Sequence, residues 1–276
     1  MERKMNENSC KFFDFERLIR RFEPNLWLFP FTGGLLLFIT LISCYLITSY
    51  TRGYPLVWLV SDVGAASPVA GYFSQSLDMI SFFFAISGYL RSKQVEYYLT
   101  RIIPRSENRQ INNLDMIRIL HEKNYQSFCC CILSSIGFII LGNFNSVDHL
   151  YEHGVGCFFM FTTIPFLISQ TFIANKLYEC DQIESRPITL TIVTYTVTIG
   201  WPLTTAIFFL SLWVHGSLFV WLDANLRLDW PSDAPSFLWF RTGIIMEWVV
   251  IMNYSPTLLV LANRMRLFKH WNRIVY

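Results

Sequence analysis

Residues 26–51 read LWLFPFTGGLLLFITLISCYLITSYT and contain no charged side chain. A helix needs about 20 apolar residues to cross the hydrocarbon core of a bilayer, so this stretch predicts a transmembrane span. The rest of the chain agrees, because 53% of its 276 residues are hydrophobic and 15% are charged, whereas soluble domains carry about 25% charged residues. The composition therefore indicates a polytopic membrane protein. It excludes an ordinary cytosolic enzyme, a secreted disulfide-rich domain and a disordered chain, and the net charge of +2 gives no sign of nucleic-acid binding.

Further apolar windows predict an all-α fold in which residues 1–276 form a single domain of six transmembrane helices. The spans are expected near residues 26–50, 72–90, 125–144, 154–175, 188–214 and 237–262. The uncharged stretch 187–222 contains Pro202, which is expected to kink one helix rather than separate two. An exoplasmic cap loop at 51–71 and a basic cytosolic loop at 91–124 connect the first three spans.

The basic residues predict the orientation. Nineteen of the 22 Lys and Arg residues lie in the N-terminal segment, in the loops after the second and fourth spans, and in the C-terminal tail. Positive charge gathers on the cytosolic side of membrane proteins, so both termini are predicted to be cytosolic. None of the seven cysteines lies in a predicted exoplasmic loop, and no disulfide framework is expected.

Three ionisable residues lie within predicted spans: Asp78 in the second, and Arg241 and Glu247 in the sixth. Such residues are costly in a bilayer and are functional candidates by default. Two explanations stay open. The first is internal pairing, for example of Asp78 with Arg241, or Glu247 kept neutral by a neighbouring helix. The second is an ion- or proton-responsive site within the bundle.

The cap loop contains SDVGAASP at residues 61–68. A side-chain acceptor at Ser61 or Asp62, the permissive backbone of Gly64 and the fixed φ of Pro68 favour an ordered turn. This pattern predicts a structural cap over the helix bundle.

The short loop between the third and fourth spans places His149 four residues before His153, on one face if the segment is helical. Asp148 and Glu152 lie beside them. Solvated polar residues, a pH-sensing pair and a metal site are the three interpretations. A metal is the least favoured, because His-x-x-x-His without a glutamate after the first histidine has little specificity.

Catalytic motifs that a membrane enzyme would need are missing from the sequence. It has no His-Glu-x-x-His, no Cys-x-x-Cys pair, no cluster of histidine boxes and no Gly-x-Ser-x-Gly turn. No catalytic residue and no cofactor is therefore expected.

Several short motifs occur in a fixed order, and in that order the chain resembles the Frag/DRAM/Sfk family of six-span membrane proteins over about residues 26–270. The motifs are PLVWLVSDVGAASP at 55–68, YFSQ at 72–75, LRSKQV at 90–95, Gly142-Asn143-Phe144, His153-Gly154-Val155-Gly156, Asp229-Trp230-Pro231 and Met246-Glu247-Trp248. The chain departs from the family where Pro68-Val69-Ala70-Gly71 replaces a Pro-Glu followed by Cys, where Asp78 replaces an uncharged polar residue, and in its longer basic loop. These departures indicate a divergent member.

The resemblance implies three roles. DRAM-type members are lysosomal regulators of autophagy, Sfk-type members help to position a phosphatidylinositol 4-kinase complex at the plasma membrane, and Frag-type members act in the remodelling of GPI anchors. We expect a non-enzymatic, DRAM-like modulator of autophagy in endolysosomal membranes, whose partners are the lipid bilayer and unidentified proteins of the autophagy or lipid-kinase machinery. A plasma-membrane kinase adaptor, and a transporter or channel using Asp78 and Glu247, are the alternatives. Structural or regulatory importance is expected for Ser61, Asp62, Gly64, Pro68, Asn143, His153, Glu247 and Trp248.

Overall fold

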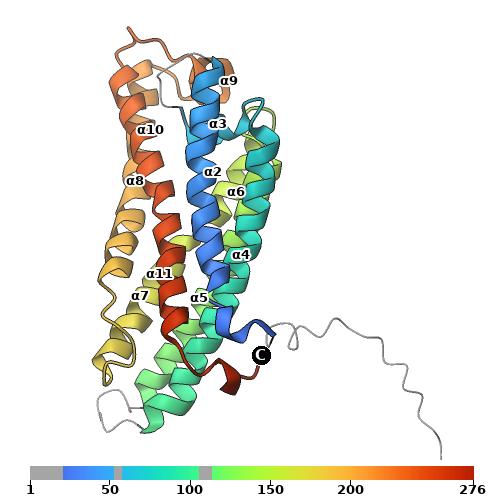
Figure 1. The fold of residues 1–276 in the computed structure, drawn as a ribbon. Helices are drawn as coiled ribbons and strands as arrows, with labels where there is room; N and C mark the ends of the chain where they lie inside the picture. Colours follow the sequence, from blue (N-terminus) through green and yellow to red (C-terminus); the bar gives the residue numbers. More distant parts are fainter. Residues whose placement is uncertain (1–20, 53–57, 106–113) are drawn as a thin grey trace, which may run out of the picture.

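The protein is an all-α membrane protein. The computed structural model describes residues 21–52, 58–105 and 114–276, and no strand occurs in these ranges (Figure 1). The main helices are α2 (Leu28–Arg52), α4 (Ala70–Tyr97), α5 (Leu114–Asn143), α6 (Leu150–Met160), α7 (Thr163–Glu179), α8 (Ile188–His215), α10 (Phe237–Met252) and α11 (Tyr254–Leu267). Shorter pieces are η1 (Glu23–Asn25), α3 (Val60–Ala65), η2 (Tyr98–Ile102), η3 (Ile103–Arg105), η4 (Leu218–Leu222), α9 (Ala224–Leu228) and η5 (Trp271–Arg273).

Two of the predicted spans are each formed by two helices, and the breaks follow from proline. Pro165 is the third residue of α7 and Pro256 the third of α11. A proline cannot donate to the carbonyl four residues earlier and its ring clashes with that carbonyl. The preceding helices accordingly end at Met160 and Met252. Pro202, by contrast, lies inside the single helix α8, as the sequence predicts.

The long helices pack as a ring in chain order. α2 packs on α4, α4 on α5, α5 on α6 and α7, α7 on α8, and α8 on α10, while α11 returns to α2 (Figure 1). In the fourth span it is α7 that makes the main contact with α8, whereas α6 packs on α5. Because of the break between α6 and α7, the first half of this span, formed by α6, does not make the main contact with α8.

The two ends of the bundle differ. We call the end where η1 meets η5 and the chain terminates the terminal end, and the end that carries α3 and α9 the cap end (Figure 1). By the distribution of basic residues, the terminal end is predicted to be cytosolic. Within the described ranges, five helical segments are long and apolar enough to cross a membrane: 23–51, 114–143, 150–179, 188–215 and 237–267.

The second predicted span, in α4, does not belong to this apolar set. Its 28 residues would extend about 42 Å at the usual helical rise, which is long enough to cross, but it carries several serines and Asp78. Because α2 and α5 flank it, many of these polar groups are buried between helices. That α4 crosses the membrane stays a prediction.

The two loops predicted from the sequence are partly helical. Much of 91–124 belongs to α4, η2, η3 and α5, because those helices continue beyond their apolar portions. In the cap loop, Ser61, Asp62 and Gly64 lie in α3 rather than in a turn, and the turn follows at 66–69, where Pro68 is exposed. Residues 53–57 and 106–113 lie outside the described part of the chain.

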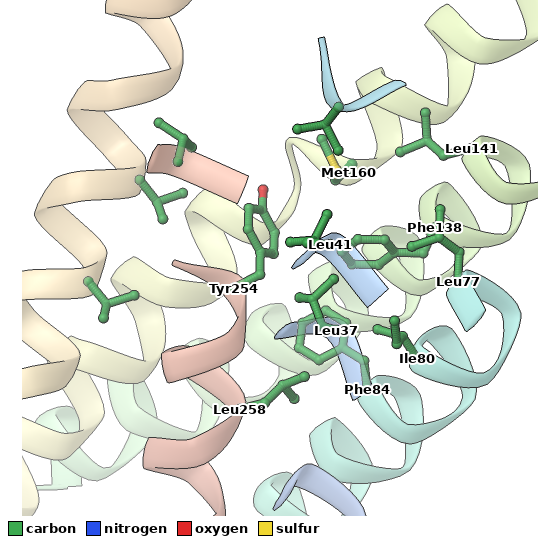
Figure 2. Close-up of a cluster of buried hydrophobic side chains, with 14 of the residues drawn as sticks. Leu37, Leu41, Leu77, Ile80, Phe84, Phe138, Leu141, Met160, Tyr254 and Leu258 are labelled. Carbon is green, nitrogen blue, oxygen red and sulfur yellow. The ribbon is translucent and has the colours of Figure 1, made fainter. Parts of the chain in front are cut away.

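Aromatic and aliphatic side chains fill the centre of the ring. Figure 2 shows part of this layer, with Phe84 and Phe138 at its centre. Phe84 packs edge-on against Phe138 and against Phe166, with ring-centroid distances of 6.2 and 5.3 Å. Tyr254 at the α10–α11 break packs against Phe138 from the other side. The buried layer lies between the two polar regions described next.

A cap-end cavity and two buried ionic clusters

A cavity of about 230 Å³ lies inside the helix bundle, towards the cap end. Its walls are mostly apolar and come from α2, α3, α4, α5, α6, α8 and α10. The polar side chains that reach it include Ser61, His153, Thr204, Arg227 and Glu247. Concave, largely apolar spaces with a few convergent polar groups are the usual form of small-molecule sites.

Glu247 and Trp248 bind the cap segment to the bundle. The Glu247 carboxylate accepts a hydrogen bond from the backbone N–H of Val60 at 3.3 Å, and Trp248 Nε1 donates to the Trp58 carbonyl at 2.7 Å. Trp58 Nε1 in turn donates to the carbonyl of Leu228 at 3.0 Å. The Glu-Trp pair of the sixth span therefore satisfies backbone groups at the start of α3, which would otherwise be buried without partners.

A buried ion pair fixes the other side of α3. Arg227 of α9 donates to both carboxylate oxygens of Asp62, at 3.2 Å through Nη2 and 3.4 Å through Nε. Ser146 Oγ also donates to Asp62 at 2.7 Å, and its carbonyl accepts from Arg227 at 2.9 Å. Both charged side chains are at most 2% exposed. The sequence singled out Asp62 but not Arg227 or Ser146, which lie far from it in the chain.

Gly64 is required by close packing. A Cβ atom built at this position would lie 2.4 Å from Cδ1 of Phe73 on α4. That distance is far below van der Waals contact, so a larger residue would push α3 away from α4.

The cavity reaches the protein surface between α6 and α8. Gly154 and Thr205 both line the cavity and both are exposed. Gly154 has no neighbouring atom within 4 Å of where a Cβ would stand. The exposed surface on either side is apolar, with Val155 and Phe158 on α6 and Leu203 and Phe209 on α8. An apolar surface of this kind on a membrane protein is predicted to face lipid chains.

The two histidines have different surroundings. His153 is buried, lines the cavity and bonds through Nδ1 to the Phe144 carbonyl at 2.8 Å. His149 is exposed at the start of α6, with its ring edge-on to that of Phe144. No group of three or more metal-ligating side chains occurs in the described ranges. A joint pH-sensing role for these histidines stays a hypothesis.

The sequence suggested that Asp78 pairs with Arg241, but the contacts of these two residues described here are with other side chains. Asp78 accepts a hydrogen bond at 2.9 Å from Nδ2 of Asn143, whose same nitrogen also donates to the Ile139 carbonyl. The Arg241 guanidinium lies over the Phe237 ring, 5.2 Å from its centroid. Asn143 thus connects the cap-end portions of α4 and α5.

A second ionic cluster lies at the terminal end and joins three parts of the chain. Glu184, in the loop between α7 and α8, forms ion pairs with both Arg91 of α4 and Arg264 of α11, all three side chains being at most 4% exposed. Gln170 accepts from Arg91 Nε at 2.9 Å, and Gln94 accepts from its Nη1 at 2.9 Å. Burial alone would raise the pKa of Glu184, but the two guanidiniums outweigh it and hold that pKa below its usual value.

The sequence does not predict this cluster, because Arg91, Glu184 and Arg264 lie far apart in the chain. The signal that points to it is the LRSKQV motif, which contains Arg91 and Gln94.

Comparison with known proteins supports the resemblance seen in the motifs. The family described as Frag1/DRAM/Sfk1/Cwh43P N-terminal domain matches residues 25–262. No curated protein and no solved structure matches the chain.

Proposed function

The chain belongs to the Frag1/DRAM/Sfk1/Cwh43P N-terminal domain family, and we propose that it is a non-enzymatic membrane regulator, a DRAM-type modulator of autophagy in endolysosomal membranes. The proposal rests on the contacts that the polar residues of the motifs make within the protein. Asp62, Glu247 and Trp248 bind the cap to the bundle, and Arg91 and Glu184 hold the terminal end together. Residues so engaged favour a scaffold over a catalyst.

The transporter hypothesis is less favoured. The cavity floor is a packed layer that includes Leu37, Ile80, Phe84, Phe138 and Leu258 (Figure 2), where the remaining void is only about 10 Å³. A transport path through Glu247 would have to open this layer. Transport through Glu247 predicts that Glu247→Gln loses the ion flux that the wild type shows in reconstituted vesicles. Unchanged flux in the variant, or no flux in the wild type, would argue against transport.

The plasma-membrane adaptor is a second candidate, favoured by a hollow of about 320 Å³ near the terminal end between α8 and α11. Ser185, Arg186, Asn263 and Arg264 line its polar part, and Leu190, Leu259 and Val260 its apolar part. Arg264 is bound to Glu184, but the exposed Arg186 beside apolar walls suits the headgroup of an anionic lipid. A site of this kind would help to hold a lipid-kinase complex at the cytosolic leaflet.

A cell experiment separates these candidates. The protein is tagged at its C-terminus with a fluorescent protein and imaged against lysosomal and plasma-membrane markers. In parallel, this protein is depleted from cells and then re-expressed. Autophagic flux is measured in both states as lysosome-dependent turnover of a cargo reporter. The proposal expects lysosomal residence and a change in flux that wild-type protein reverses. Surface residence with unchanged flux would overturn it in favour of the adaptor.

A binding experiment tests the histidines. If His149 and His153 sense an acidic lumen, the double variant His149→Ala/His153→Ala should lose any change in partner binding between neutral and acidic luminal pH, while keeping its location. A difference equal to that of the wild type would contradict the pH hypothesis.

A further inference from the structure

We propose that the cap-end cavity binds the apolar limb of a hydroxyl-bearing membrane lipid, which enters from the bilayer between α6 and α8. The inference goes beyond the regulatory function, because the site would exist in whichever membrane holds the chain. It is carried by three features of the cavity: its opening, its size and its polar groups.

The opening selects the source of the ligand. The cavity reaches the surface at Gly154 and Thr205. On the same two helices, the side chains of Phe158 and Phe209 are 70% and 59% exposed. Large apolar side chains so exposed on a membrane protein lie against lipid tails. Molecules of the bilayer therefore meet the opening first.

The size limits how much of the lipid can enter. A cavity of roughly 150 Å³ lined by apolar side chains holds a benzene molecule, and this one measures about 230 Å³. The space thus accepts one ring system or chain segment, while the remainder of the lipid stays between α6 and α8 or in the bilayer.

The polar groups select a hydroxyl over a charged headgroup. Thr204 is 1% exposed and faces the cavity, and among the described residues its Oγ1 has no hydrogen-bond partner. Glu247 also faces the cavity. A hydroxyl can donate to a carboxyl oxygen and accept from a threonine at the same time. A phosphate would lie unfavourably close to the carboxyl oxygens of Glu247. The cationic Arg227, which could compensate for the phosphate charge, is already bound to Asp62.

The test uses purified full-length protein in lipid nanodiscs and two photoreactive probes with the same diazirine group. One is a sterol and the other a ceramide, so that the two sources of a hydroxylated apolar limb are compared directly. Cross-linked peptides are identified by mass spectrometry. We expect one probe to label cavity-lining peptides of α6, α8 or α10, and an excess of the same unlabelled lipid to compete.

Matched variants locate the site. Gly154→Phe should fill the opening and reduce cavity labelling at least fivefold. Gly71→Phe, at an exposed α4 position that also has open space around its Cβ and does not line the cavity, should leave it unchanged. Thr204→Val keeps the side-chain shape and should weaken competition by the unlabelled lipid about twofold to tenfold. Thr196→Val, which removes only a bond to the Ile192 carbonyl, is its control.

The outcomes are distinct. The site is supported if either probe labels cavity peptides, if the unlabelled lipid competes with that labelling, and if Gly154→Phe reduces it. The probe that labels then identifies the class of lipid that binds. Labelling confined to lipid-facing side chains, labelling that unlabelled lipid does not reduce, or equal labelling of Gly154→Phe and Gly71→Phe would each overturn it. Size-exclusion profiles confirm that the variants fold, and the wild-type competition result stands without them. Because no cellular readout is involved, failure here is distinguishable from failure of the autophagy proposal.

Discussion

At the scale of single residues, the ion pair between Asp62 and Arg227 is the contact whose loss should matter most at the cap end. Removing one partner of a buried pair leaves the other charge uncompensated and costs about 3–5 kcal/mol. We predict that Asp62→Ala lowers the thermal unfolding midpoint of detergent-solubilised protein by several degrees and reduces its level in cells. Fluorescence-detected size exclusion after heating measures the midpoint.

Two controls accompany this prediction. Asp148→Ala removes an exposed carboxylate whose Oδ2 accepts from Asn145 and should have little effect. The double variant Asp62→Ala/Arg227→Leu should be more stable than Asp62→Ala, because it removes the orphaned guanidinium. If the double variant is no better, the charge of Arg227 is not what destabilises the single one.

Gly64 offers a second residue-scale prediction. Gly64→Ala would place a methyl group against the Phe73 ring, and overpacking of this kind costs about 1–3 kcal/mol. We predict a lower unfolding midpoint that the second substitution Phe73→Leu partly restores. Gly71→Ala, with open space at its Cβ, should leave the midpoint unchanged or raise it. Equal midpoints for the two alanine variants would contradict the packing argument.

At the scale of elements, Glu184 ties the α7–α8 loop to α4 and α11. Because the pKa of Glu184 is lower in the folded protein than its usual value, the unfolded chain binds more protons in the acidic range. The stability contributed by this carboxylate is therefore complete above the usual glutamate pKa, about 4.5, and is lost as pH falls through the folded value.

This linkage predicts the behaviour of Glu184→Gln. The variant should unfold at a lower temperature than the wild type at pH 7, and its midpoint should fall less steeply between pH 5 and pH 3, about the range over which such carboxylates titrate. Thermal unfolding in detergent over a pH series measures both effects. Glu122→Gln, which removes an exposed pair with Arg118, is the control. Parallel pH profiles for wild type and Glu184→Gln would show that the Glu184 carboxylate does not stabilise the fold through its ion pairs.

The elements also show how far sequence reasoning reached. The apolar windows predicted six helical segments because a bilayer imposes a minimum apolar length, and the breaks at Pro165 and Pro256 changed only their continuity. Asp62 and Glu247 could be singled out because charge near apolar sequence is rare. Their partners Arg227 and Val60 could not, since those contacts join residues about 165 and 187 positions apart. The cavity could not be predicted, because its walls come from helices spread along the whole chain.

At the scale of the whole molecule, the number of crossings decides which side each cluster faces. In the part of the chain that the structure describes, five helical segments have the length and composition of a span, and α4 has only the length. The described N-terminal segment η1 and the C-terminal η5 lie together at the terminal end. Chain ends that meet at one end of a bundle require an even number of crossings, so we predict that α4 crosses the membrane as the sixth span.

Reporter accessibility tests this topology. In cells with a selectively permeabilised plasma membrane, epitope tags at the N- and C-termini should both be reached by antibody, because both termini are predicted to be cytosolic. An inserted tag after Asp148, between α5 and α6, should be protected until the internal membranes are opened. An odd number of spans would place the two terminal tags on opposite sides. That result would contradict the arrangement in which α4 runs beside α2 and α5 through the bundle.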